Sequence, residues 1–127
     1  DFVYALGGDS IQSAIDKLLP NNFSQIPVIE ASGRIDLMTT NTIFRWFGGT
    51  ASPDPLSTTV GDVIRYKEAD EKFDCIPPTT TVFSVVEAFR REAALIAQII
   101  TDDGTFYGSG KAILTASDIP TLLNEIT

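Results

Sequence analysis

The sequence predicts an α+β protein made of two small units, each with the order strand–helix–strand–strand–helix. The first observation is an internal repeat, because the segment Asp9–Glu30 has a counterpart about 71 positions later, in Thr80–Thr101. The second is the spacing of the hydrophobic residues, which follows helical and strand patterns in the same order in both copies. The third is a threonine, Thr39 or Thr115, placed where the last strand of each copy turns into a helix. Repetition of this kind decides architecture before any single motif does.

The first copy begins with the apolar run Phe2–Leu6, which we expect to be its first strand. Asp9 or Ser10 is a suitable cap for the helix that follows. We expect the segment Pro20-Asn21-Asn22 to end this helix. The apolar face of the helix comprises residues that recur at helical spacing, namely Ile11, Ala14, Ile15, Leu18 and Leu19.

The rest of the first copy is a predicted hairpin followed by a helix. Ile26–Glu30 and Arg34–Met38 are the two strands, and residues 31–33 contain the glycine typical of the turn. The second helix begins near Thr39 and ends at the glycine pair 48–49. The first repeat therefore covers residues 1–50.

A Ser/Pro-containing linker, residues 51–72, carries the predicted short helix Thr59–Ile64. The second repeat covers residues 73–127, and at this chain length we expect the repeats to form one globular module. Its first two strands are Phe73–Ile76 and Ile96–Thr101, and a third strand leads to Thr115. The helix between the first two strands is capped by Thr80 or Thr81. Asp118–Ile126 forms the last helix. The buried face of the first of these helices comprises Val82, Val85, Val86 and Phe89.

The two copies do not stay in phase. Ile26 aligns with Ala97 at an offset of 71, whereas Thr39 aligns with Thr115 at an offset of 76. We therefore expect five inserted residues, placed around Tyr107–Lys111. The glycines of this segment invite a phosphate-loop interpretation, but the Walker spacing is not met, so we expect a flexible hairpin.

Charge and composition exclude several classes of function. Nine basic residues against 17 acidic ones give a net charge of −8, which disfavours binding to nucleic acid or to an anionic membrane surface. No apolar run is long enough for a membrane span. Because there is no histidine and Cys75 is the single cysteine, we expect no catalytic Ser-His or Cys-His pair, no metal site and no intrachain disulfide. We expect a cytoplasmic protein that is not an enzyme.

The start of the last helix in the second copy has the pattern of a ligand site. Thr115 and Asp118 place a hydroxyl and a carboxylate three residues apart at a helix N-terminus, where a phosphate or a ribose diol could be bound. The same spacing is also that of a capping box without any ligand. Pro120 fits the first helical turn if Asp118 is the cap, but would lie inside the helix if Thr115 is the cap.

Several segments carry a resemblance to a known family. They are Ser24–Ile29 with Leu37–Thr39 in the first copy, Thr81-Val82 with Ala112–Ile119 in the second, and Thr59–Ile64 between them. Together, and in this order, they resemble a tandem pair of cystathionine β-synthase (CBS) domains, often called a Bateman module. The resemblance implies two β-α-β-β-α repeats related by a pseudo-twofold axis, forming a non-catalytic regulatory module that binds adenosine-containing ligands such as AMP, ADP or ATP.

In this family a hydroxyl and an acid contact the ribose or phosphate, which implies such a role for Thr115 and Asp118. The apolar walls implied for this second-repeat cleft are Cys75, Ile76, Pro77, Ala97 and Ile99. The resemblance requires no cofactor and no metal. An adenine nucleotide or another adenosyl compound would be a regulatory ligand.

The first copy departs from the family motif, because Thr42 stands where the acid is expected. A neutral hydroxyl is a poorer partner for a ribose diol than a carboxylate, so we expect this cleft to be weaker or empty. The residues implied for this weaker site are Thr39, Thr42, Ile26 and Pro27. The second copy also departs from the family pattern, since Ala97-Gln98 replaces its Ile-Pro pair.

Partners are implied by the same resemblance. We expect a homodimer formed through the apolar helix that carries Ile43, Phe44, Trp46 and Phe47. Because the chain begins with Asp1, we expect an effector domain outside it. The alternative to ligand sensing is a ligand-free scaffold for dimerisation or interaction within a larger protein.

Overall fold

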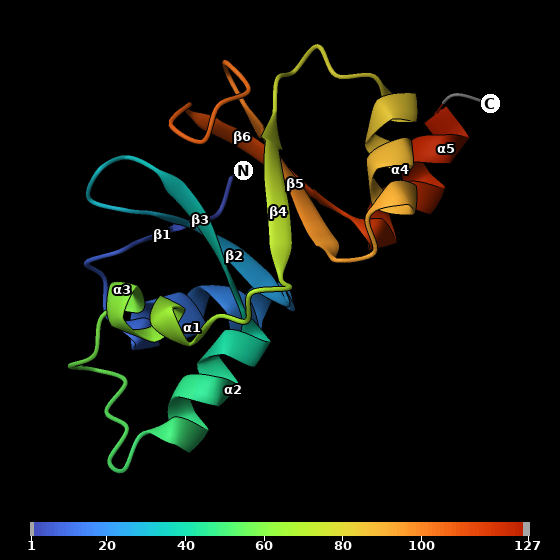
Figure 1. Cartoon of the computed structure of the whole chain (residues 1–127). Coiled ribbons are helices and arrows are strands. Elements are labelled where there is room, and N and C mark those ends of the chain that lie inside the picture. The colour runs from blue at the N-terminus through green and yellow to red at the C-terminus, as the bar shows by residue number, and fades with distance from the viewer. Residues whose placement is uncertain (1, 126–127) are drawn as a thin grey trace. The chain divides into compact units, whose positions relative to one another are not determined.

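The structure, a computed structural model, describes residues 2–125 and the side chains of residues 2–124. The chain folds into two compact units (Figure 1). The first unit is Val3–Glu68, and the second unit contains Phe2 and the residues from Ala69 onward. Each unit has its strands and helices in the order β-α-β-β-α, which confirms the predicted α+β class and repeat order. None of the described helices is long and apolar enough to cross a membrane.

The first unit contains a three-stranded sheet in the order β1-β2-β3, with β1 parallel and β3 antiparallel to β2. Its strands are β1 (Ala5–Leu6), β2 (Gln25–Ile29) and β3 (Ile35–Thr39). Its helices are α1 (Ile11–Asn21), α2 (Thr40–Gly49), α3 (Val60–Val63) and the 3₁₀ helix η1 (Ile64–Tyr66). Residues 51–68 therefore pack with the first repeat.

One predicted boundary in the first unit is wrong, and the predicted end of its first helix is confirmed. Only Ala5–Leu6 of the apolar run pairs as a strand, and Phe2 lies against Gly110 of the second unit. Pro20 lies inside the last turn of α1. The helix ends at Asn21 and is capped by Asn22, which adopts a left-handed conformation with a φ of 53°, so its end lies within the predicted segment 20–22.

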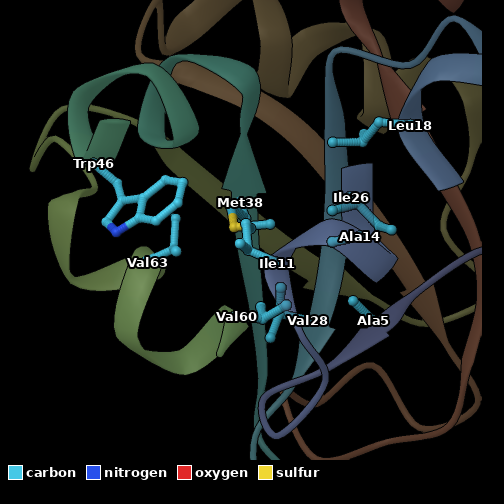
Figure 2. Close-up of a cluster of buried hydrophobic side chains, with 10 residues drawn as sticks. All are labelled: Ala5, Ile11, Ala14, Leu18, Ile26, Val28, Met38, Trp46, Val60 and Val63. Carbon is cyan, nitrogen blue, oxygen red and sulfur yellow. The ribbon is translucent and has the colours of Figure 1, made fainter. Parts of the chain in front are cut away.

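The hydrophobic core of the first unit lies between one face of its sheet and its helices. Figure 2 shows Ile11 and Met38 near the middle of this cluster, with Trp46 and Val63 on one side and Ile26 on the other. Trp46 is only 3% exposed, so it is a core residue. The remaining members of the cluster are Ala5, Ala14, Leu18, Val28 and Val60.

The second unit contains a sheet in the order β4-β5-β6, with β4 parallel and β6 antiparallel to β5. Its strands are β4 (Lys72–Ile76), β5 (Leu95–Thr101) and β6 (Gly110–Thr115). Its helices are α4 (Val82–Arg91), capped by Thr81, the 3₁₀ helix η2 (Ala116–Asp118) and α5 (Ile119–Glu125). Helix α5 starts one residue later than predicted, and its predicted end at Ile126 lies outside the described residues.

Strand register corrects the alignment of the two copies. Gln25 lies opposite Thr39 in the first unit, and Ala97 lies opposite Thr115 in the second. Ala97 is therefore the counterpart of Gln25, whereas the sequence had aligned it with Ile26. One of the five extra residues precedes β5, and the other four lie in the β5–β6 hairpin. The offset of 71 is kept only by the helix caps and the first strands.

Gln98 is thus the counterpart of Ile26, and both side chains lie on the helix-facing side of their sheets. Ile26 belongs to the apolar core, whereas the Gln98 amide, 2% exposed, donates a hydrogen bond from Nε2 to the backbone carbonyl of Val85 at 2.9 Å. Burial of a polar amide is tolerated here because its donor is bonded.

The complete burial of Ile26 leads to a prediction about stability. Replacing the fully buried Ile26 by alanine removes methylene groups and leaves a cavity, so we expect a loss of about 2–5 kcal/mol in the free energy of unfolding. The matched control is Leu56→Ala, because Leu56 is 76% exposed and should change stability by less than about 0.5 kcal/mol. Urea unfolding followed by circular dichroism measures both. Equal effects of the two substitutions would contradict this core.

Candidate functional site

The predicted second-copy motif lies where β6 passes into η2. The Thr115 backbone N–H donates to Asp118 Oδ2 at 2.8 Å, and the two residues form a capping box. Both predicted capping alternatives are thus partly right. Thr115 caps the 3₁₀ turn, and because α5 begins only at Ile119, Pro120 still falls in the first turn of that helix.

The capping box leaves part of the motif available. The Thr115 hydroxyl lies 3.4 Å from Asp118 Oδ2 and 2.7 Å from the Ser117 hydroxyl. Both of these contacts of the Asp118 carboxylate involve Oδ2, and Oδ1 makes no hydrogen bond within the described residues. Ser117 is exposed and contributes a hydroxyl that the sequence analysis did not assign, although it stands inside the motif. The site therefore offers two hydroxyls and one carboxylate oxygen to a polar ligand.

The predicted wall residues do not all lie on one side of the sheet. Ala97 pairs with Thr115, and Cys75 pairs with Ile99, so these four side chains share one face by strand alternation. Ile76 points to the opposite face. Ala97 and Ile99 are fully buried, and Cys75 is 6% exposed.

Pro77, the remaining predicted wall residue, is exposed and follows β4. The β5–β6 hairpin packs against it, because a Cβ atom at Gly104 would lie 2.7 Å from Pro77 Cδ. Gly104 has a φ of 76°, a conformation that side chains disfavour. Only glycine therefore allows the hairpin to approach Pro77 this closely.

Hydrogen bonds hold the hairpin around two carboxylates. Asp102 Oδ1 accepts from the Ser109 N–H at 2.8 Å, and Asp103 Oδ1 accepts from the Thr105 N–H at 2.9 Å. The bonds from the Thr105 amide and hydroxyl lower the pKa of Asp103. Both carboxylates lie close to Gly108. A loop lined by acids is unsuited to a phosphate, which agrees with the hairpin interpretation of this segment.

The first-copy motif is closed by its own side chains. Thr39 is 7% exposed and Thr42 is fully buried. The Thr39 hydroxyl caps α2 by accepting from the Thr42 N–H at 3.1 Å, and the two hydroxyls are 3.2 Å apart. Pro27 shares the sheet face of Thr39, but Ile26 lies in the core on the opposite face. The structure therefore separates Ile26 from the other residues predicted for this site.

A hollow in the first unit was not predicted. It measures about 480 Å³ and lies at the carboxyl ends of β1 and β2. Thr39 lies at the opposite end of the sheet, because it pairs with Gln25, the first residue of β2. Its lining is almost entirely apolar or glycine, with Glu30 as its single charged residue. The sequence signal for it was the pair Gly7-Gly8, which leaves the space open.

No protein-family model and no curated protein matches the chain. A CBS domain-containing protein of unknown function from Kribbella flavida is similar in structure, with a TM-score of 0.72 and 12% identity over 98% of this chain and 93% of that one. CBSX2 in complex with AMP gives a TM-score of 0.67 and 13% identity over 98% and 89%.

A third solved structure is the CBS domain of the bacterial CNNM/CorC family Mg²⁺ transporter in complex with ATP. It gives a TM-score of 0.66 and 14% identity, and the match covers 98% of this chain and 80% of that one. Identity this low is evidence for the fold alone. The two β-α-β-β-α units therefore have the fold of CBS-domain structures.

Proposed function

We propose that this chain is a regulatory, non-catalytic module that senses an adenosine-containing ligand, chiefly at the Thr115–Asp118 turn. The single observation that carries the proposal is the difference between the two motifs. Thr115, Ser117 and Asp118 present hydroxyl and carboxylate oxygens at the end of β6, whereas Thr39 and Thr42 are buried against each other. A ribose diol needs acceptors that it can reach, and only the second motif offers them.

The fold supports this assignment. Two solved structures of the same fold were determined with AMP and with ATP. The apolar positions that we propose for the cleft are Cys75, Pro77, Ala97 and Ile99; Ile76 is left out because it lies on the opposite face of the sheet. By strand register, Ile99 is the counterpart of Pro27, so an apolar residue is kept at that position.

The unusual Gln98 does not weaken the proposal. Its side chain is directed to the helix side and its amide is bonded to the carbonyl of Val85. It therefore serves helix packing and does not replace a wall residue. Regulation would follow from differential affinity, because a ligand that binds one conformation more tightly shifts the population toward it.

Ligand binding is tested by calorimetric titration and thermal shift with AMP, ADP, ATP, S-adenosylmethionine, NAD(H) and cyclic di-AMP. We expect at least one to stabilise the protein, by about 2.7 kcal/mol at a concentration 100 times its Kd. Asp118→Asn should weaken that ligand about 10-fold or more, because a hydrogen bond to a charged group is lost. Asparagine keeps an oxygen that can accept from the Thr115 N–H, so the turn should remain capped.

Two control variants make the test specific. Asp62→Asn changes the same residue type at the same position of another Thr-x-x-Asp turn, where Thr59 accepts from the Asp62 N–H at 3.2 Å. Thr42→Val alters the closed first motif. Both should leave the affinity within about twofold of the unaltered protein. The proposal fails if no ligand binds to well-folded protein, or if Thr42→Val weakens binding more than Asp118→Asn does.

A ligand-free dimerisation scaffold is the second candidate, and an exposed apolar groove favours it. Phe44 and Phe47 of α2 are 77% and 57% exposed, and Leu19 and Phe23 near the end of α1 are 74% and 42% exposed. All four line one hollow of about 350 Å³. Of the residues predicted for a dimer surface, Trp46 is instead buried and Ile43 is half-buried, so the proposed surface combines α2 with α1.

Oligomeric state tests this second candidate. We expect the unaltered protein to elute as a dimer and Phe44→Ser to elute as a monomer, because the substitution removes a 77% exposed aromatic ring from the lining of the groove. The control is Phe83→Ser, which changes an equally apolar residue, 68% exposed on α4 of the second unit. Light scattering after size exclusion measures the mass. A monomeric unaltered protein, or dimers of both variants, would contradict the scaffold surface.

A further inference from the structure

We propose that the hollow at the carboxyl ends of β1 and β2 is a second binding site, which takes a small apolar molecule that carries one amine. The hollow belongs to the first unit and is lined by residues 6–8, residues 28–31, Gly61 and Ile64. None of these residues belongs to the site proposed at the Thr115–Asp118 turn. The proposal therefore goes beyond the sensing of an adenosine-containing ligand and does not depend on it.

The walls of the hollow are held by hydrogen bonds, so the site is formed before any ligand binds. The Gly7 N–H donates to the Ile29 carbonyl at 2.9 Å, and the Leu6 N–H donates to Asp9 Oδ2 at 2.9 Å. These two bonds fix the turn that follows β1 against the end of β2. The volume of about 480 Å³ suits a small molecule, and sites for small molecules are usually largely preformed.

Helix α3 forms another wall, and a glycine allows it to approach the turn closely. The Gly61 N–H donates to the Gly7 carbonyl at 2.9 Å, and a Cβ atom at Gly61 would lie 3.2 Å from that carbonyl oxygen. Figure 1 shows α3 beside the chain that follows β1. A molecule in the hollow would therefore contact both the sheet of the first unit and the helix of the predicted linker.

The start of α1, next to the turn, is already occupied by carbonyl groups of the chain. The first two amides of this helix, those of Ile11 and Gln12, donate to the carbonyls of Thr58 and Pro55 at 2.8 and 3.0 Å. Amides at a helix start are the groups that hold phosphates, so these bonds remove the usual anion site. Glu30, the single charged residue of the lining, adds a negative charge. A nucleotide is therefore disfavoured in this hollow.

The lining favours a ligand with an apolar body. Leu6 is 48% exposed although its side chain is large and apolar, and Ile29 and Ile64 are half-buried beside it in the lining. Covering this surface removes apolar area from water, which favours binding of a hydrocarbon or aromatic group. The glycines of the turn leave room for such a group.

The carboxylate of Glu30 favours a ligand that also carries a cation. Glu30 Oε2 lies 3.9 Å from Arg34 Nη1, which is longer than a hydrogen bond, and the two side chains are 40% and 42% exposed. Such a loose, exposed pair leaves the carboxylate able to accept a charge-assisted hydrogen bond from an amine. The net charge of −8 attracts a cation to the protein as well.

Titration of the unaltered chain with three indoles of similar shape, followed by amide chemical shifts in NMR spectra, tests the site. The probes are tryptamine, which is a cation, 3-methylindole, which is neutral, and indole-3-acetate, which is an anion. We expect tryptamine to shift the amides of Gly7, Gly8, Ala31 and Gly61 saturably, with an affinity about threefold higher than that of 3-methylindole. Indole-3-acetate should give no saturable shift at these amides.

A substitution that fills the hollow makes the test specific. A Cβ atom at Gly8 would meet no atom within 4 Å, so the turn has room for the side chain of Gly8→Leu, and we expect the affinity for tryptamine to fall by about tenfold or more. The matched control is Gly48→Leu, because Gly48 of α2 has equally open surroundings and lies outside the hollow. It should leave the affinity within about twofold.

A second variant, Glu30→Gln, should abolish the preference for tryptamine over 3-methylindole while 3-methylindole still binds. It keeps the test decisive if Gly8→Leu does not fold. Four results would overturn the proposal: no saturable shift with tryptamine, binding of indole-3-acetate as tight as that of tryptamine, equal effects of Gly8→Leu and Gly48→Leu, or an unchanged preference in Glu30→Gln. None of these results bears on nucleotide binding, which is measured separately at Asp118.

Discussion

Each unit depends on how its last strand passes into a helix. The first backbone N–H groups of a helix have no partner inside it, so a side chain at the end of the strand must supply one. Thr39 does this for α2 and Thr115 does it for η2. The threonine therefore marks the point where the strand ends and the helix begins in each unit. The same oxygens would meet a ligand, so capping and binding compete for them.

The two copies resolve this competition differently. In the first unit the hydroxyls of Thr39 and Thr42 are buried and lie within hydrogen-bond distance of each other. Asp36 forms an ion pair with Lys67, and Asn41 donates a hydrogen bond to Glu68. In the second unit the carboxylate of Asp118 caps the turn with one oxygen, while the hydroxyl of Ser117 is exposed. One fold thus carries a motif devoted to structure and a motif that keeps polar groups available. Duplication makes this division possible, because only one copy has to supply each role.

The sequence predicted the repeat, the class and nearly every helix and strand, since these follow from local periodicity and capping. It was wrong where a long-range contact decided the outcome. The sequence offset of 71 aligns Ile26 with Ala97, but pairing of Ala97 with Thr115 shifts the register by one residue. A shift of one residue moves a side chain to the other face of a sheet, so sequence spacing alone could not assign the cleft walls.

The sequence by itself determined the two β-α-β-β-α units, the acidic charge and the asymmetry between Thr42 and Asp118. These are properties of residue order and composition, which need no knowledge of packing. Only the tertiary structure decided that Trp46 is core, that Ile76 and Ile99 lie on opposite faces, and that Lys67 reaches Asp36 across 31 positions of sequence. The physical reason is that burial and ion pairing depend on which segments meet in space. That meeting is specified by strand register and by helices packed on one face of each sheet.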